Sequence, residues 1–320
     1  MSAEGRAAGA SLPARVVFLG SGAFGIPVLE SLRSIPGIDL VGVVTLPARP
    51  AGRHATPTPT PAAAAADAAG LPVLRLASVR TPEALGRVAA LRPDLGVLAD
   101  FGRIVPAGLL TLAPHGILNV HPSLLPRHRG ATPVPATILA GDEVAGVSVI
   151  LMDEGLDTGP LLGAESWSLR GDETAPELEE RAAAVAAAMV RRLVPAWLAG
   201  EIEAAPQASV GVTLTRPFRR EDGRLDPSEP AVRLERMVRA LRPWPGTFLE
   251  TAVGRLAVLE AEVAASEPDD EAGRLVADGD ELAFSTSDGR LRLLRVQPAG
   301  GRSMTAAEFR RGSGRRFLGF

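Results

Sequence analysis

The run Asn119-Val120-His121 near the middle of the chain carries side chains that could catalyse the transfer of an acyl group. An asparagine amide can donate a hydrogen bond to an oxygen that gains negative charge, while a neighbouring imidazole moves a proton. Asn119 is the one asparagine in a sequence of 320 residues. Its retention favours a need for the amide itself over the alternative, an asparagine that only closes a turn.

An acidic, glycine-rich run at residues 153–159 could supply a partner for the imidazole. A carboxylate beside an imidazole holds one tautomer of the ring and raises its basicity, which completes an acid–base device. The spacing of the acids lacks the pattern of an EF-hand, so a calcium loop of that type is excluded. The sequence therefore predicts a catalytic site made of Asn119, His121 and a carboxylate.

The elements that must position these residues alternate between strand and helix. Short apolar runs indicate strands, and apolar residues at helical spacing indicate helices between them. The expected strands cover residues 15–19, 40–46, 73–76, 95–101 and 116–120, and the expected helices include residues 24–32, a run after Pro61, and residues 82–91. This alternation predicts a Rossmann-like α/β fold, which is a mostly parallel sheet with helices on both faces.

The fifth expected strand ends at the run that could do the chemistry. In an open α/β sheet the carboxyl ends of the strands form the ligand crevice. Asn119 and His121 stand at alternate positions of that strand, so their side chains point to the same side of the sheet.

The sequence pattern changes after Gly200, where the alternation of strand and helix ends, and this change indicates the domain organisation. Residues 201–230 contain four prolines and little periodicity, which is typical of a linker. A helix and several short strands separated by Gly, Asp and Ser then predict a small OB-like β-barrel. We expect a disordered N-terminal extension at residues 1–13, a catalytic domain at residues 14–200, a linker at residues 201–230, and the barrel domain at residues 231–320.

A glycine-rich turn at residues 20–25 follows the first strand and has the G-x-G-x-x-G spacing of dinucleotide-binding folds. That fingerprint also requires an acidic residue at the end of the second strand to bind the ribose. The strand ends here at Leu46-Pro47 without one. A tight first turn serves any doubly wound sheet, so we expect no NAD site.

The composition limits the cellular setting and the chemistry. The chain has no cysteine and four histidines, which excludes disulfides and a thiolate nucleophile, and we expect no metal site. The N-terminal residues lack the apolar segment of a signal peptide, and the longest apolar helical stretch is too short to span a bilayer. The net charge is −3, so a nucleic-acid partner would need local clusters of arginine. We expect a cytoplasmic monomer.

The runs NVHPSLLPRHRGATP at residues 119–133 and DEGLDTG at residues 153–159 resemble the hallmark of the folate-dependent formyltransferases. The resemblance covers nearly the whole chain. Its C-terminal part is similar to the branch of the family that formylates initiator methionyl-tRNA, whereas the glycinamide ribonucleotide formyltransferases resemble only the first domain. The C-terminal runs are RREDGRLD at residues 219–226, RPWPG at residues 242–246 and LLRVQPAG at residues 293–300.

The resemblance implies a donor, an acceptor and a division of roles. The formyl group would pass from 10-formyltetrahydrofolate to the free amino group of methionine on the initiator methionyl-tRNA. Asn119 would donate to the tetrahedral oxyanion, His121 would polarise that oxygen or move the proton, and Asp157 would orient the histidine or a water. No metal is implied. The residues that match the family's tetrahydrofolate segment are Ser123, Leu124, Leu125 and Pro126.

The resemblance also assigns tRNA contacts to arginines in two places. Arg53 lies in the loop after the second strand, and Arg219 and Arg220 lie in the expected linker. The sequence departs from the family at residues 54–59, which replace the lysines that usually follow the first of these arginines. Local positive charge is therefore lower in that loop.

Two alternatives remain. A related enzyme that formylates the amine of a sugar nucleotide would keep Asn119, His121 and Asp157 but would not need the matching C-terminal runs. A tRNA-binding or nucleotide-binding module without catalytic activity would not need these three residues at all.

Overall fold

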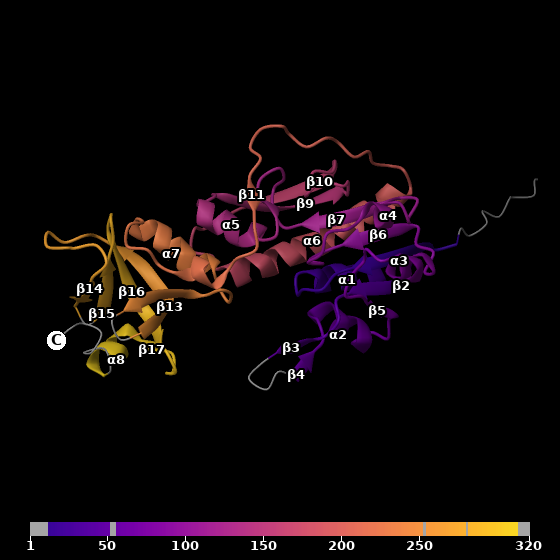
Figure 1. Ribbon diagram of the computed structural model, residues 1–320. Coiled ribbons are helices and arrows are strands. Elements are labelled where there is room, and N and C mark those ends of the chain that lie inside the picture. Colours follow the sequence, from indigo (N-terminus) through magenta and orange to yellow (C-terminus); the bar gives the residue numbers. More distant parts are fainter. Residues whose placement is uncertain (1–11, 52–55, 252–253, 280, 313–320) are drawn as a thin grey trace, which may run out of the picture. The chain divides into compact units, whose positions relative to one another are not determined.

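The computed structural model describes residues 12–51, 56–251, 254–279 and 281–312 (Figure 1). Arg53 and most of the expected N-terminal extension lie outside the described residues. Contacts within the chain divide it into two compact units, and the expected domain boundaries at residues 200 and 230 stay predictions. The first unit takes Met1–Pro126, Gly146–Glu165 and Arg181–Val212, and the second takes Arg127–Ala145, Ser166–Glu180 and Thr213–Phe320.

Most residues of a seven-stranded sheet belong to the first unit. The strand order is β10-β9-β7-β6-β1-β2-β5. The five strands β7, β6, β1, β2 and β5 run parallel to one another, each paired with the next in this order. Strand β9 runs antiparallel to β7. The prediction of a mostly parallel α/β sheet is confirmed. The strands are β1 (Ala14–Leu19), β2 (Ile38–Thr45), β5 (Val73–Arg75), β6 (Leu95–Leu98), β7 (Ile117–His121), β9 (Val144–Leu151) and β10 (Leu161–Ser168).

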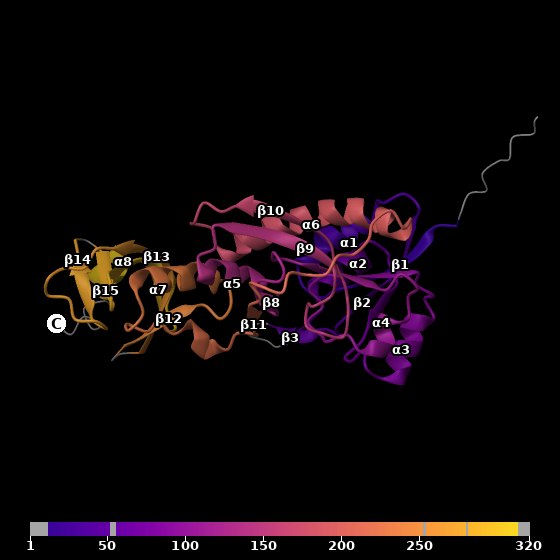
Figure 2. The same ribbon diagram turned by 90° about the horizontal axis from the view of Figure 1, so that it is seen from above.

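Helices cover both faces of this sheet (Figure 2). On one face, α3 and α4 pack against Val17, Leu19 and Ile117 in one apolar cluster. On the other face, α1 lies beside α6, where the Ser31 hydroxyl donates to the carbonyl of Ala187 at 2.8 Å. None of the described helices has the length and apolar character that crossing a membrane requires. The helices are α1 (Gly25–Arg33), α2 (Pro61–Ala68), α3 (Pro82–Ala89), α4 (Ala107–Leu110) and α6 (Ala175–Leu198).

The strand expected at residues 95–101 is shorter than predicted, because β6 ends at Leu98. Asp100 adopts a left-handed backbone with φ +51°, which a strand cannot continue through. Its carbonyl accepts the N–H groups of Ser21 and Gly22 at 2.8 and 3.1 Å. The chain therefore leaves β6 in a turn that is bound to the turn after β1. A short hairpin also went unpredicted because its strands contain prolines: β3 (Arg49–Ala51) and β4 (Thr56–Thr58).

An antiparallel sheet is the main feature of the second unit, so the prediction of a C-terminal β domain is confirmed. Its order is β12-β13-β16-β15-β14, and β17 pairs with β16. Leu234, Phe284 and Phe309 contribute to its buried core. The elements are α7 (Ala231–Ala240), β12 (Thr247–Thr251), β13 (Gly254–Ala264), β14 (Leu275–Asp278), β15 (Glu281–Ser285), β16 (Arg290–Pro298), β17 (Met304–Thr305) and α8 (Ala306–Arg311).

The expected linker contains short elements that the sequence did not predict. β11 (Leu214–Thr215) pairs in parallel with β8 (Arg129–Gly130), and η1 (Arg220–Gly223) follows. His128 holds this pair in place. Its backbone N–H donates to the Thr213 hydroxyl at 2.8 Å, and its Nε2 lies 2.7 Å from the Asp142 carboxylate. The helix α5 (Pro133–Ala140) packs against α7 in the same unit.

An ion pair between Arg290 and Asp270 connects β16 to the segment before β14. Arg290 Nε and Nη2 each lie 2.6 Å from a carboxylate oxygen, and the Ser285 hydroxyl donates to the same group at 3.0 Å. Both charged side chains are about nine-tenths covered, at 11% and 9% exposed. The hydrogen bonds from Arg290 lower the pKa of Asp270 to about 2.

This pair predicts an acid-sensitive contribution to stability. Since the folded pKa lies below the ordinary value of 3.8, the contribution is full above that value and is lost as pH falls through about 2. We expect Asp270→Asn to lower the urea midpoint at neutral pH, with the difference from wild type vanishing near pH 2. The exposed neighbour Asp269 provides the control, and Asp269→Asn should change the midpoint little at any pH. A difference independent of pH would contradict the assignment to the carboxylate charge.

Candidate active site

Strand β7 fixes the positions of Asn119 and His121. Ile117, Asn119 and His121 alternate with Leu118 and Val120, so the first three side chains share one face of the sheet. β6 pairs with one edge of β7 and β9 with the other, which holds the backbone on both sides. The two polar residues are only 6% and 5% exposed. A buried amide and a buried imidazole need hydrogen-bond partners to offset the loss of water.

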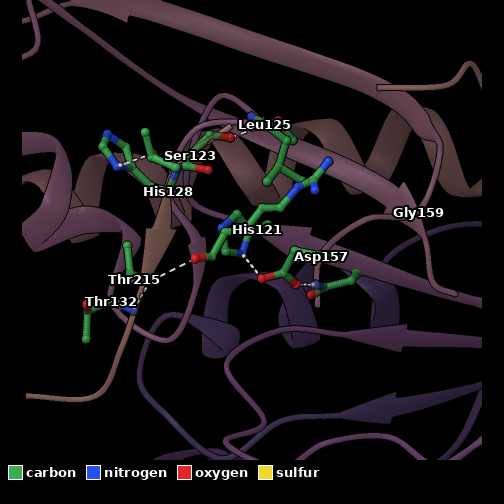
Figure 3. A network of polar contacts seen from close by, with 12 residues as sticks. His121, Ser123, Leu125, His128, Thr132, Asp157, Gly159 and Thr215 are labelled. Atoms are coloured by element: carbon green, nitrogen blue, oxygen red, sulfur yellow. Dashed lines mark hydrogen bonds and ion pairs between the residues drawn. The ribbon is translucent and has the colours of Figure 1, made fainter. Parts of the chain in front are cut away.

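Asp157 supplies such a partner from the turn between β9 and β10. Asn119 Nδ2 donates to Oδ1 of Asp157 at 3.0 Å, and His121 Nδ1 lies 3.7 Å from Oδ2. Figure 3 shows the imidazole of His121 and the carboxylate of Asp157 pointing toward each other. The structure therefore brings the three predicted catalytic residues into one cluster, in which a single carboxylate engages both the amide and the imidazole.

The turn that carries Asp157 depends on a close approach of backbones. Asp157 has φ +52°, a left-handed conformation that few residues other than glycine adopt. The Asp153 carboxylate accepts the Gly155 N–H at 3.0 Å and the Thr158 hydroxyl at 2.7 Å, which ties together the two ends of the segment that contains Asp157. At Gly159 a Cβ atom would lie 1.8 Å from the carbonyl oxygen of Leu151. Only glycine fits there, because that oxygen belongs to the backbone at the end of β9.

The predicted folate segment begins directly after β7. The Ser123 N–H donates to the carbonyl of His121 at 2.9 Å, so the chain turns at once. On β9, the buried Ser148 hydroxyl donates to the Ser123 carbonyl at 2.8 Å and accepts the Leu125 N–H at 3.1 Å. Sequence reasoning missed Ser148, although a hydroxyl inside the apolar run VAGVSVIL was a usable signal. Leu124 and Pro126 are half-buried, which leaves part of both side chains accessible.

The glycine-rich turn after β1 has a structural explanation that involves no dinucleotide. A Cβ atom on Gly22 would lie 1.5 Å from Oδ2 of Asp100, and one on Gly20 would lie 2.4 Å from the ring of Phe18. The glycines allow the turn to pack against the end of β6. The Asp100 carboxylate stands beside the turn that opens α1.

The two described arginines predicted to bind tRNA are exposed on the second unit. Arg219 precedes η1, and the guanidinium of Arg220 lies 6.0 Å from the ring centre of Trp244. The neighbouring Arg216 is bound to the Asp222 carboxylate at 2.6 and 2.8 Å, and its hydrogen bonds lower the pKa of Asp222 to about 2. Arg216 is therefore already neutralised, whereas no ion pair of Arg219 or Arg220 occurs within the described ranges.

The cluster at the end of β7 has the chemistry of acyl transfer. A buried amide can stabilise an oxyanion, and an imidazole beside a carboxylate can move one proton. Within the part of the chain that the structure describes, no group of three or more His, Asp and Glu side chains could hold a metal ion.

Comparison with known proteins identifies relatives along nearly the whole chain. A family model described as formyl transferase matches residues 14–194, and one described as formyl transferase, C-terminal domain, matches residues 217–314. A methionyl-tRNA formyltransferase of Halorhodospira halophila is 42% identical over 307 residues, covering 94% of this chain and 97% of the relative. One of a Roseiflexus species is 41% identical over 302 residues, covering 94% and 93%.

Solved structures share the fold. An N-formyltransferase from Helicobacter canadensis, in complex with folinic acid and dTDP-3-aminofucose, has a TM-score of 0.65 at 13% identity and covers 91% of this chain and 100% of its own. Glycinamide ribonucleotide transformylase 1 from Symbiobacterium toebii has a TM-score of 0.51 at 24% identity, and the match covers 62% of this chain and 100% of that protein. At these identities the likeness shows the fold alone.

The close approach of Gly159 to the Leu151 carbonyl predicts that a side chain at position 159 would disturb the site. Gly159→Ala should push the turn away from Leu151 and displace Asp157, so catalytic turnover should fall by about tenfold or more. The matched control is Gly86→Ala in helix α3, where a Cβ atom meets nothing within 4 Å. That variant should keep full turnover and unfold at the same or a slightly higher temperature. Equal turnover in both variants would show that the turn tolerates displacement.

Proposed function

The chain belongs to the formyl transferase family, and we propose that Asn119, His121 and Asp157 are the groups with which it transfers a formyl group to the methionine amine of methionyl-tRNA. One observation carries the proposal: a single carboxylate engages the amide and the imidazole at the carboxyl end of β7. The tRNA acceptor is favoured over a sugar amine because relatives with that activity match across both family domains. The N-formyltransferase whose structure contains dTDP-3-aminofucose shares 13% identity with this chain.

Asn119 acts on the oxygen of the formyl group. When the amine nitrogen attacks the formyl carbon, a C–N bond forms and the carbonyl electron pair moves to oxygen, which becomes negative. The amide nitrogen of Asn119 carries two hydrogens. One of them bonds Asp157, and that bond orients the second toward the developing oxyanion. Burial strengthens this interaction because little water competes for the charge.

His121 and Asp157 handle the proton. The attacking amine gains positive charge as the bond forms and must lose a proton. Asp157 holds the Nδ1 side of His121 and accepts that proton through the imidazole or through a water. Collapse of the intermediate then breaks the bond from the formyl carbon to N10 of the donor, and N10 takes up the proton. The products are tetrahydrofolate and formylated methionyl-tRNA.

The donor is 10-formyltetrahydrofolate, bound in part by the segment Ser123, Leu124, Leu125 and Pro126. This segment adjoins His121, and Ser148 fixes its turn through two hydrogen bonds. Its half-buried leucine and proline side chains suit the apolar part of a folate. The folinic acid in the Helicobacter canadensis relative supports a folate donor for this fold.

The acceptor tRNA is held by arginines. Arg219 and Arg220 provide exposed cations, and the neighbouring Trp244, 56% exposed, offers a face on which a base can stack. Arg53 stays a prediction of the same kind. A protein that modifies initiator tRNA acts where translation begins, so we infer a cytoplasmic location, and we expect a monomer.

The catalytic roles predict large losses of turnover. Asn119→Ala and Asp157→Asn each remove a group that stabilises charge present only in the transition state. Each should lower kcat by about a hundredfold or more, which corresponds to ~3 kcal/mol. The measurement is transfer of labelled formyl from 10-formyltetrahydrofolate to methionyl-tRNA, together with folate binding, which should change little.

The control is a histidine outside the cluster. His115 is exposed, and His115→Ala should retain turnover. More than about a tenth of wild-type turnover in Asn119→Ala or Asp157→Asn would contradict the assignment. An amino-sugar nucleotide added as a competing acceptor should remain unformylated, and efficient formylation of it would favour the alternative substrate class.

The arginines predict a salt-dependent affinity for tRNA. Each phosphate contact releases counterions, so binding should weaken as salt rises. The double variant Arg219→Ala and Arg220→Ala should bind tRNA more weakly and lower the slope of log K against log salt by about 1 to 2. The double variant Arg33→Ala and Arg87→Ala, at exposed positions on α1 and α3, is the control and should leave the slope unchanged. Equal slopes in the two double variants would remove Arg219 and Arg220 from the tRNA site.

A further inference from the structure

Gln207 contacts the turn that carries the catalytic carboxylate. Its side-chain nitrogen Nε2 donates to the carbonyl of Asp157 and to the carbonyl of Gly159, each at 2.8 Å. An amide nitrogen carries two hydrogens, so one side chain can satisfy both carbonyl oxygens at once. The side chain is partly buried, which makes these bonds harder for water to replace.

The backbone near Gln207 is held against the strand that leaves the same turn. Leu161, the first residue of β10, forms an antiparallel bridge with Ala205. The Leu161 N–H donates to the Ala205 carbonyl at 2.7 Å, and the Ala205 N–H donates back at 2.8 Å. The segment after α6 therefore returns to the site and presents Gln207 at a fixed distance from Asp157.

The turn needs this support because its conformation is unfavourable by itself. Asp157 has a left-handed backbone, and Gly159 is pressed against the carbonyl of Leu151. The carboxylate of Asp157 is bound on one side by Asn119. Gln207 binds the backbone of the same turn, so the distance from the carboxylate to His121 depends on both contacts.

We propose that Gln207 is a positioning residue, whose amide holds the carbonyls of Asp157 and Gly159 and thereby sets the carboxylate against Asn119 and His121. The inference rests on the proposed catalytic role of Asp157. It is independent of folate binding, because the segment at Ser123 is held separately by Ser148.

The first test replaces the donor. Gln207→Ala in the full-length protein should lower kcat by about ten- to a hundredfold, because small displacements of catalytic groups are costly. The KM values for methionyl-tRNA and 10-formyltetrahydrofolate should change by less than about threefold. The matched control is Gln297→Ala, which removes the other glutamine of the chain, an amide that donates to the Gly301 carbonyl at 2.9 Å in the second unit. Its kcat should equal that of wild type.

The second test uses pH. In Gln207→Glu an ionised carboxylate would face two carbonyl oxygens and repel them, whereas a protonated one keeps a single O–H donor. The ratio of its kcat to that of wild type should therefore rise as pH falls, and no such rise should occur for Gln207→Ala. A ratio independent of pH would contradict hydrogen bonding to the turn.

The third test separates this inference from the proposed function. If Gln207 acts through Asp157, then Gln207→Ala should cost little further rate in a protein that already carries Asp157→Asn. An equal loss in both backgrounds would overturn the positioning role. So would wild-type kcat in Gln207→Ala, or a loss that only follows a lower melting temperature. Full activity of Asp157→Asn alone would instead refute the proposed function.

Discussion

The hydrogen bond from the amide of Asn119 to the carboxylate of Asp157 joins groups that lie 38 residues apart in the chain. Both are largely removed from water, so each would be costly without the other. The bond forms only if β7 and the turn before β10 meet at one distance. β9 ensures this, because it pairs with β7 along four residues and ends at the backbone against which Gly159 packs.

Close contacts between the strands and the turn that carries Asp157 therefore shape this site. The amide of Asn119 and the imidazole of His121, to which we assign catalytic roles, stand on a strand with neighbours on both edges, and Ser148 on β9 holds the next segment. Catalytic groups on strands are held with little freedom, which keeps their donors aimed at the charge that develops in the reaction. In the second unit the proposed tRNA-binding residues Arg219 and Arg220 are exposed instead of buried. Because the protein has a net charge of −3, such binding would depend on this local positive charge.

The sequence by itself determined most strands and helices of the parallel sheet, and it predicted the residues that the structure brings together at the end of β7. Short apolar runs and apolar residues at helical spacing predicted the parallel strands and their helices, because both patterns depend on neighbours along the chain. The alternation of side chains along a strand placed Asn119 and His121 on one face at a strand end. The resemblance to formyltransferases selected Asp157 among the acids of its turn, a choice that the spacing alone had left open.

Only the tertiary structure decided which segments meet. That β9 inserts beside β7, that β6 ends at Leu98, and that Ser148 binds the predicted folate segment all depend on pairing between distant strands. Gln207 shows most plainly what local sequence cannot predict. It lies in a proline-containing stretch without periodicity, a pattern that we interpreted as a linker. Its two contacts with the catalytic turn depend on a backbone bridge between Leu161 and Ala205, and such a bridge leaves no pattern in the local sequence.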